Sequence, residues 1–158
     1  MIQKARSSPA VKIREAGLRD LNEMQRLECV CFDTEAFTKY QLRYLLTTPT
    51  AVSLVAEVDG HFAGFVIGII NRNRYGTYGR IYTLDVDDPF RGLGIGTRLT
   101  EALLERLKEA GCGKCFLEVR EDNKSAVALY LKLGFEKKYF IPHYYAPDVH
   151  AIKMWKNL

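Results

Sequence analysis

The sequence contains no apolar run of membrane-spanning length. Its longest candidate, residues 62–70, is interrupted by Gly64 and Gly68. The basic N-terminal stretch 1–10 has no apolar core of the kind that a secretory signal requires, and we expect it to be a flexible tail. These absences predict a cytoplasmic protein without a membrane partner.

Neither sign of charge dominates the chain. Lysine and arginine number 23 against 19 acidic residues, a formal net charge of +4, and the basic residues are scattered among the acids. A bias this small argues against nucleic acid as a partner and favours a mixed, solvated surface. With 158 residues, of which 47% are hydrophobic, the chain can bury a core, and we expect one domain over residues 1–158.

Cysteine is scarce, and its spacing completes no metal site. Cys112 and Cys115 have the spacing of a redox or zinc half-site, whereas Cys29 and Cys31 are separated by one residue. The three histidines form no matching pair, so no metal is predicted. The Cys112–Cys115 pair also follows a helix and precedes a strand, unlike a thioredoxin-type site. Buried thiols and small residues in a turn are the favoured interpretation.

Apolar periodicity divides the chain into strands and helices. Runs typical of strands lie at 11–14, 51–58, 62–70, 80–86, 115–120, 135–141 and 149–155. Helical spacing is found at 18–32, 38–47, 93–110 and 123–133. In the third of these, Ile95, Leu99, Leu103 and Leu107 recur every four residues and form the apolar stripe of an amphipathic helix. The polar segments 71–79 and 142–148 are predicted as loops. This order predicts a mixed α/β or α+β sheet with parallel crossovers around the two long helices.

A glycine-rich stretch joins the strand that ends at Val86 to the longest helix. After Arg91, the glycines Gly92, Gly94 and Gly96 alternate with aliphatic residues, so the backbone can turn sharply and approach a ligand. The following helix presents unpaired N–H groups and the positive end of its dipole, which suit a phosphate. The stretch matches neither a P-loop nor a dinucleotide fingerprint. It is either an ordinary tight turn or another kind of phosphate cradle.

Two acidic residues interrupt strands that are otherwise apolar. Glu118 lies at the centre of 115–120, where a carboxylate must be paired, protonated or exposed in a cleft. A general base is the favoured role, and a structural ion pair with Arg120 at i+2 is the alternative. Asp85 interrupts 80–86 in the same way, but nearer the end of its strand.

The helix at 123–133 carries two further candidates. Asn123 is a good N-cap by residue type, and Tyr130, seven residues later, lies on the same helix face. Their functional interpretation is an amide that contacts a ligand and a phenol that protonates a leaving group. A helix cap and a core aromatic are the structural alternatives.

These motifs together resemble the GNAT acetyltransferases. Arg-Gly-Leu-Gly-Ile-Gly at 91–96 is similar to the pyrophosphate loop of that superfamily. Leu-Glu-Val-Arg-Glu-Asp-Asn at 117–123, followed by Leu-Tyr at 129–130 and Gly-Phe at 134–135, resembles the RimI-like N-terminal acetyltransferases. The ending at 143–154 resembles the same subfamily, although Asp-Val-His-Ala at 148–151 departs from its usual acidic-Asp-Ala pattern.

The resemblance implies a GNAT-like fold, with a mostly antiparallel sheet, a splayed parallel strand pair and about four helices. It implies transfer of acetyl from acetyl-CoA to an amine, with a protein or peptide N-terminus as the favoured acceptor. A protein lysine or a small-molecule amine is the alternative acceptor, and a non-catalytic acyl-CoA-binding module is a less favoured alternative function.

The resemblance also implies roles for particular residues. The catalytic pair would be Glu118, as base, and Tyr130, as acid toward the departing thiolate. The cofactor would be held by Leu84, Asp85, Val86, Arg91, Gly92, Leu93, Gly94, Ile95, Gly96, Asn123 and Tyr130. The acceptor would contact Phe32, Glu35, Tyr144 and Tyr145. From the residues alone, the loop at 32–37 is either the edge of a cleft or a plain helix connection.

Overall fold

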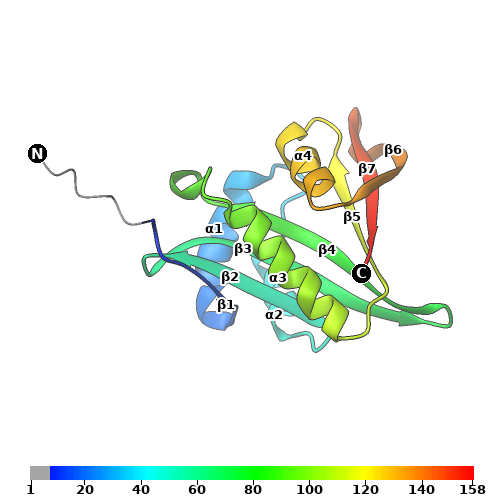
Figure 1. Ribbon diagram of the computed structural model, residues 1–158. Helices are drawn as coiled ribbons and strands as arrows, with labels where there is room; N and C mark the ends of the chain where they lie inside the picture. Colours follow the sequence, from blue (N-terminus) through cyan, green and yellow to red (C-terminus); the bar gives the residue numbers. More distant parts are fainter. Residues whose placement is uncertain (1–7) are drawn as a thin grey trace, which may run out of the picture.

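Seven strands form one sheet in the computed structural model, which describes residues 8–158 (Figure 1). The strands are β1 (Val11–Glu15), β2 (Ala51–Val58), β3 (His61–Asn73), β4 (Gly76–Val86), β5 (Lys114–Arg120), β6 (Glu136–Ala146) and β7 (Val149–Asn157). Their order in the sheet is β1-β2-β3-β4-β5-β7-β6. Neighbouring strands are antiparallel, except that β4 and β5 are parallel. The predicted mixed sheet is confirmed.

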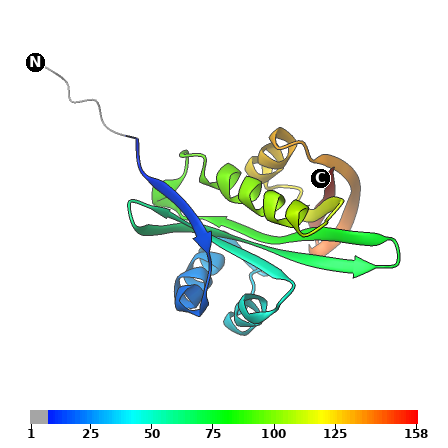
Figure 2. The same ribbon diagram turned by 60° about the horizontal axis from the view of Figure 1, so that its bottom comes forward.

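Helices lie on both faces of this sheet (Figure 2). Within the described part of the chain they are α1 (Leu21–Cys31), α2 (Lys39–Thr47), α3 (Ile95–Glu109) and α4 (Lys124–Lys132), with 3-10 turns at Leu18–Asp20 and Asp88–Phe90. α1 and α2 cover one face, and α3 and α4 lie on the other. None of these helices is long and apolar enough to cross a membrane.

Each face has its own apolar core. On the α3 face, the predicted stripe of Ile95, Leu99, Leu103 and Leu107 is fully buried against the sheet. On the other face, the core consists mainly of Met24, Leu27, Leu42, Val55, Phe65 and Ile67. The sheet is therefore buried on both sides near β3, which fixes the register of the strands that flank the site.

Two glycines let α3 approach the sheet closely. A Cβ at Gly68 would lie 2.9 Å from Leu103 Cδ1, and one at Gly79 would lie 2.6 Å from Leu107 Cδ1. Glycine inside a strand often marks such a close approach. These contacts set the position of α3, whose first turn begins at the glycine-rich stretch.

The parallel pairing of β4 and β5 is short. It joins Tyr78–Arg80 to Lys114–Phe116 and continues no further. Beyond that point β4 stays paired with β3 as far as Val86, and β5 stays paired with β7 as far as Arg120. The two strands diverge, as Figure 1 shows, and open a split in the middle of the sheet.

Two segments predicted as loops are strands. β3 and β4 continue through most of 71–79 as a projecting hairpin, and β6 continues through 142–146. Both segments are largely exposed and so show no apolar alternation, and within 71–79 the two strands are held together by backbone pairing. The other predicted elements are confirmed with shifted ends, and the helix expected from residue 18 starts as a 3-10 turn. Of the predicted N-terminal tail, residues 1–7 lie outside the described residues.

Candidate functional site

A cavity of about 360 Å³ occupies the split between β4 and β5. From the α1–α2 side it is lined by the predicted acceptor residues Phe32, Glu35, Tyr144 and Tyr145. From the α4 side it is lined by Asn123, Ala126 and Tyr130, and Leu84 and Glu118 come from the two diverging strands. Residues far apart in the sequence thus meet in one space, and its size is typical of a small-ligand site.

The edge of β4 presents backbone groups without strand partners to this split. Asp87 N–H donates to the Ala63 carbonyl of the neighbouring segment at 2.8 Å. In an antiparallel pair successive residues direct their N–H and C=O groups to opposite sides, so Asp85 faces β3 whereas Leu84 and Val86 face the split. A ligand carrying amides can bond to these groups as a neighbouring strand does.

The glycine-rich stretch forms an open loop before α3. Gly92 and Gly94 have φ of +79° and +74°, and a Cβ on either would meet no atom within 4 Å. Gly94 is the N-cap of α3 and offers no side-chain acceptor to the first-turn N–H groups. Gly96 differs, because a Cβ there would contact Leu129 of α4 at 3.4 Å. The loop is therefore open at Gly92 and Gly94, as the predicted phosphate cradle requires, and it packs against α4 at Gly96.

Glu118 is paired with two cations. Its Oε2 lies 2.8 Å from Arg80 Nη2, and its Oε1 lies 3.6 Å from Lys153 Nζ. Arg80 also donates to the Tyr144 hydroxyl at 3.1 Å. Glu118 is therefore part of an ion pair, as its alternative interpretation held, but Arg120 is not the partner. Arg120 lies two residues further along β5, and its guanidinium contacts the carboxylates of Glu35 and Asp122 instead.

Arg120 anchors the loop between α1 and α2. Its guanidinium donates to Glu35 at 3.2 Å and to Asp122 at 2.9 Å. The same loop is held at its far end, where the Phe37 ring stacks on Tyr82 with centroids 6.1 Å apart. Of the two interpretations of residues 32–37, the cleft edge is the one that the structure supports.

Tyr130 is a core aromatic and Asn123 is a helix cap, as their structural alternatives predicted, and both residues also face the cavity. The Tyr130 ring packs edge-on against Phe135, and burial raises the pKa of its phenol, so the hydroxyl keeps its proton near neutral pH. Asn123 Oδ1 caps α4 by accepting from Ala126 N–H at 3.2 Å. Both side chains also line the cavity, where the phenol O–H and the Asn123 NH₂ group are hydrogen-bond donors.

A buried pair of carboxyl groups lies beside the cavity, and sequence reasoning missed one of them. Glu28 on α1 and Asp85 on β4 are each 1% exposed, and Thr83 Oγ1 lies 2.9 Å from Glu28 Oε2 and 2.7 Å from Asp85 Oδ1. Burial, the Glu28 charge and a hydrogen bond between the two hold the pKa of Asp85 well above its ordinary value. The pair therefore holds a proton to higher pH than isolated carboxyl groups do, and this proton is shared between Glu28 and Asp85.

The position of Glu28 carried a signal in the sequence. It lies four residues after Met24 and seven after Leu21, on the apolar face of α1, just as Glu118 interrupts an apolar strand. Asp85 was predicted among the cofactor residues, but it does not line the cavity, and its side chain and backbone face Glu28 and β3. Leu84 and Val86 are the residues of that group that face the split.

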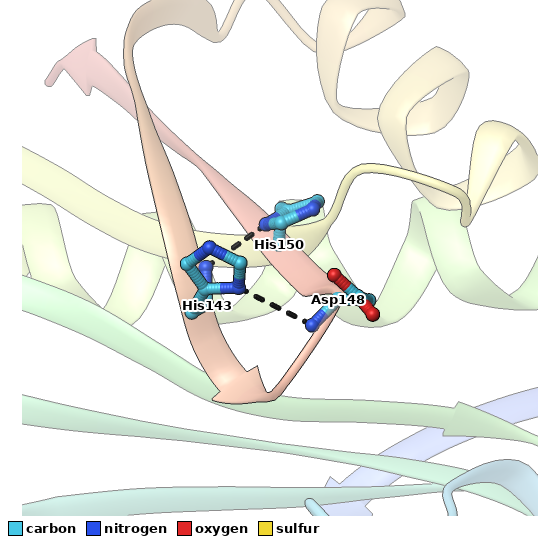
Figure 3. Close-up of side chains that lie close together, drawn as sticks. All are labelled: His143, Asp148 and His150. Carbon is cyan, nitrogen blue, oxygen red and sulfur yellow. Dashed lines mark hydrogen bonds between the residues drawn. The ribbon is translucent and has the colours of Figure 1, made fainter.

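Two histidines and an aspartate meet on the hairpin of β6 and β7 (Figure 3). Donor atoms of His143, Asp148 and His150 lie within 4.8 Å of one another, a proximity that their spacing did not predict. His150 Nδ1 accepts from His143 N–H at 2.9 Å, and His143 Nδ1 accepts from Asp148 N–H at 3.2 Å. Because both Nδ1 atoms are engaged with the backbone, these side chains brace the turn, where His143 and Asp148 have positive φ.

The Cys112–Cys115 pair has the properties of buried thiols. Both cysteines are buried and free, and burial raises the pKa of Cys115 to about 12. Neither lines the cavity. A nucleophilic or redox role would need an accessible thiolate, so the structural interpretation stands.

Three comparisons place these features among known proteins. A model described as the acetyltransferase (GNAT) family matches residues 18–135. An N-alpha-acetyltransferase from Sulfurisphaera tokodaii is 31% identical and covers 96% of this chain and 95% of the relative. A putative [ribosomal protein bS18]-alanine N-acetyltransferase from Bacillus subtilis is 31% identical, covering 92% and 95%. The crystal structure of Ard1 from Thermoplasma volcanium has a TM-score of 0.83 at 29% identity, covering 94% and 98%.

The shared proton of Glu28 and Asp85 predicts how one substitution changes stability with pH. A carboxyl group whose pKa is raised by folding stabilises the fold fully below its unfolded pKa, about 4, and this contribution is lost as pH rises through the folded pKa. Asp85→Asn replaces the carboxyl O–H with an amide N–H donor toward Glu28 and cannot ionise. We expect the variant to gain stability relative to the parent between pH 4 and pH 8, by about 1.4 kcal/mol for each unit of pKa elevation.

Thermal or urea unfolding across this pH range measures the difference. Glu101→Gln, an exposed change on α3, is the matched control and should show no such trend. A difference between Asp85→Asn and the parent that stays constant from pH 4 to pH 8 would contradict the shared proton.

Proposed function

The chain belongs to the acetyltransferase (GNAT) family, with acetyl-CoA as its acetyl donor, and from this premise we propose that its acceptor is the N-terminal α-amine of a protein or peptide. The observation that carries the proposal is the cavity through the sheet, which is lined from both faces. A donor can enter from the α3–α4 face and an acceptor from the α1–α2 face, with Glu118 between them.

The residues present fit acetyl-CoA. The open, positive-φ loop at Gly92 and Gly94 would hold its diphosphate on the first turn of α3, together with Arg91. Leu84 and Val86 would pair with its pantetheine amides, and the Asn123 NH₂ group would hold the same arm. When bound, the group supplies an acetyl thioester, which a neutral amine can attack directly.

Glu118 and Tyr130 would move the two protons of the reaction. Glu118 takes a proton from the acceptor ammonium, directly or through water, and Arg80 and Lys153 fix its carboxylate at the centre of the cavity. Tyr130, which keeps its proton near neutral pH, donates it to the sulfur that leaves. Direct attack requires no covalent enzyme intermediate, so neither Cys112 nor Cys115 has a part in it.

The acceptor end of the cavity has a lining that suits the N-terminus of a peptide. Phe32 and the edge-to-face pair Tyr144 and Tyr145 supply aromatic walls, and Glu35 is held there by Arg120. A lysine side chain or a small amine is the alternative acceptor. Two relatives, each matched across 95% of its own length, are named N-alpha-acetyltransferase and putative [ribosomal protein bS18]-alanine N-acetyltransferase, and these names favour the chain terminus.

The cofactor loop predicts a specific loss of affinity. Gly94→Asn places a side chain over the cradle, and asparagine is one of the residues that tolerate positive φ. We expect acetyl-CoA to bind about tenfold or more weakly, as isothermal titration would show. Gly60→Asn is the matched control, because Gly60 has φ of +83° and open space in a remote turn. Equal acetyl-CoA affinity of Gly94→Asn and the parent would remove the loop from the cofactor site.

Removal of the general base should lower the turnover rate without weakening acetyl-CoA binding. Glu118→Gln keeps the shape of the side chain but cannot accept the proton, so we expect kcat to fall by roughly 10² to 10⁴ while the affinity for acetyl-CoA changes little. Glu105→Gln, exposed on α3, should be unchanged. A Glu118→Gln enzyme that turns over as fast as the parent would exclude Glu118 as the base.

The acceptor class is tested by CoA release with a panel of amines. The panel contains short peptides with different first residues, the same peptides with blocked N-termini, free lysine and spermidine. We expect turnover only with free peptide N-termini. Turnover with blocked, lysine-containing peptides or with spermidine, and none with free N-termini, would replace the proposed acceptor and leave the cofactor assignment intact.

A further inference from the structure

A second hollow continues from the cavity along the sheet. We call it the basic groove: it has a volume of about 730 Å³ and runs from Arg80 and Tyr82 to the turn of the β3–β4 hairpin. The cations that line it are Arg80, Lys114, Lys138 and Lys153. No carboxylate lines it within the described part of the chain. Its charge is therefore of one sign, although the charge of the whole chain is balanced.

The groove lies on the part of the sheet that the helices leave uncovered. Gly79 and Ile81 of β4 face α3, so the alternate residues Tyr78, Arg80 and Tyr82 point to the opposite face. On that face, α1 and α2 lie over the β1–β4 half of the sheet (Figure 2). The remaining half, formed by β5, β7 and β6, is open.

Aromatic rings support the cations of the groove. Lys138 Nζ and Lys153 Nζ lie 5.1 and 5.2 Å from the centre of the Phe116 ring, and Lys114 Nζ lies 4.6 Å from that of Trp155. Arg80 and Lys153 share the charge of Glu118. Lys114 and Lys138 have no carboxylate within 4.0 Å among residues 8–158. Their charges remain available to a partner.

The groove is continuous with the catalytic cavity. Arg80 and Tyr82 line both, and Lys153 links the groove to Glu118. An extended chain that leaves the cavity along β4 would pass from Arg80 to Gly76, four residues or about 13 Å. About four residues of an acceptor fit along this path.

We propose that the segment following the first residues of the acceptor lies in the basic groove, and that this segment is acidic. The inference rests on the proposed function, since it identifies the class of protein N-terminus that the site selects. The groove favours a peptide over a nucleic acid because it leads directly into a cavity built for a chain end and an amine.

Peptide kinetics test the inference. Three peptides share their first two residues and carry either aspartate and glutamate, asparagine and glutamine, or lysine at positions 3–7. The enzymes are the parent, Lys114→Gln/Lys138→Gln, and the control Lys12→Gln/Lys108→Gln, which removes the same charge from exposed sites outside the groove. We expect the acidic peptide to have the lowest KM with the parent, and 0.5 M salt to reduce its advantage.

With the groove variant, the KM of the acidic peptide should rise roughly three- to tenfold, with the neutral peptide unaffected and the control variant equal to the parent. Acetylation of all three peptides with equal KM would overturn the groove and leave the proposed function standing. No acetylation of any peptide would overturn both. A uridine oligonucleotide that binds more tightly than the acidic peptide, and loses affinity in the groove variant, would assign the groove to nucleic acid.

Discussion

The interrupted pairing of β4 and β5 is the constraint from which the rest of the site follows. The two strands are bonded over three residues and then part, because β4 follows β3 and β5 follows β7. Separation leaves backbone N–H and C=O groups without strand partners, and such groups need a ligand or water. The same opening connects the two faces of the sheet, so substrates that arrive from opposite sides can meet at one point.

Charge is arranged around this opening in two different ways. Glu118 stands in the opening, and its pairing with Arg80 and Lys153 links β5 to β4 and β7. Glu28 lines one wall of the cavity and Asp85 lies behind it, and their burial is compatible with only one negative charge on the pair. The first arrangement holds a carboxylate that can exchange protons with a substrate. The second helps to hold α1 against β4, and so helps to position the acceptor side of the cavity.

Patterns that depend on local geometry were predictable from the sequence. The mixed sheet, the stripe on α3 and the Asn123 cap follow from periodicity and residue type, and the splayed strand pair followed from the resemblance carried by the motifs. The same reasoning failed at 71–79 and 142–146. These strands are largely exposed, so their sequences show no alternation of apolar and polar residues. Arg80 was missed because its partner Glu118 lies 38 residues away, and no local rule connects them. The burial of Glu28 could have been predicted from the sequence. A carboxylate on the apolar face of a helix is as unusual as one inside an apolar strand.

We propose that donor and acceptor reach one another through the sheet from opposite faces. Amide hydrogen exchange with a conjugate of CoA and a peptide, joined at the peptide N-terminus, can detect both contacts in one experiment. We expect slowed exchange both at the start of α3, residues 92–98, and on the proposed acceptor side, residues 32–37 and 144–146. CoA alone should protect only the former. Protection by the conjugate that is confined to one face would show that the two substrates do not meet through the sheet.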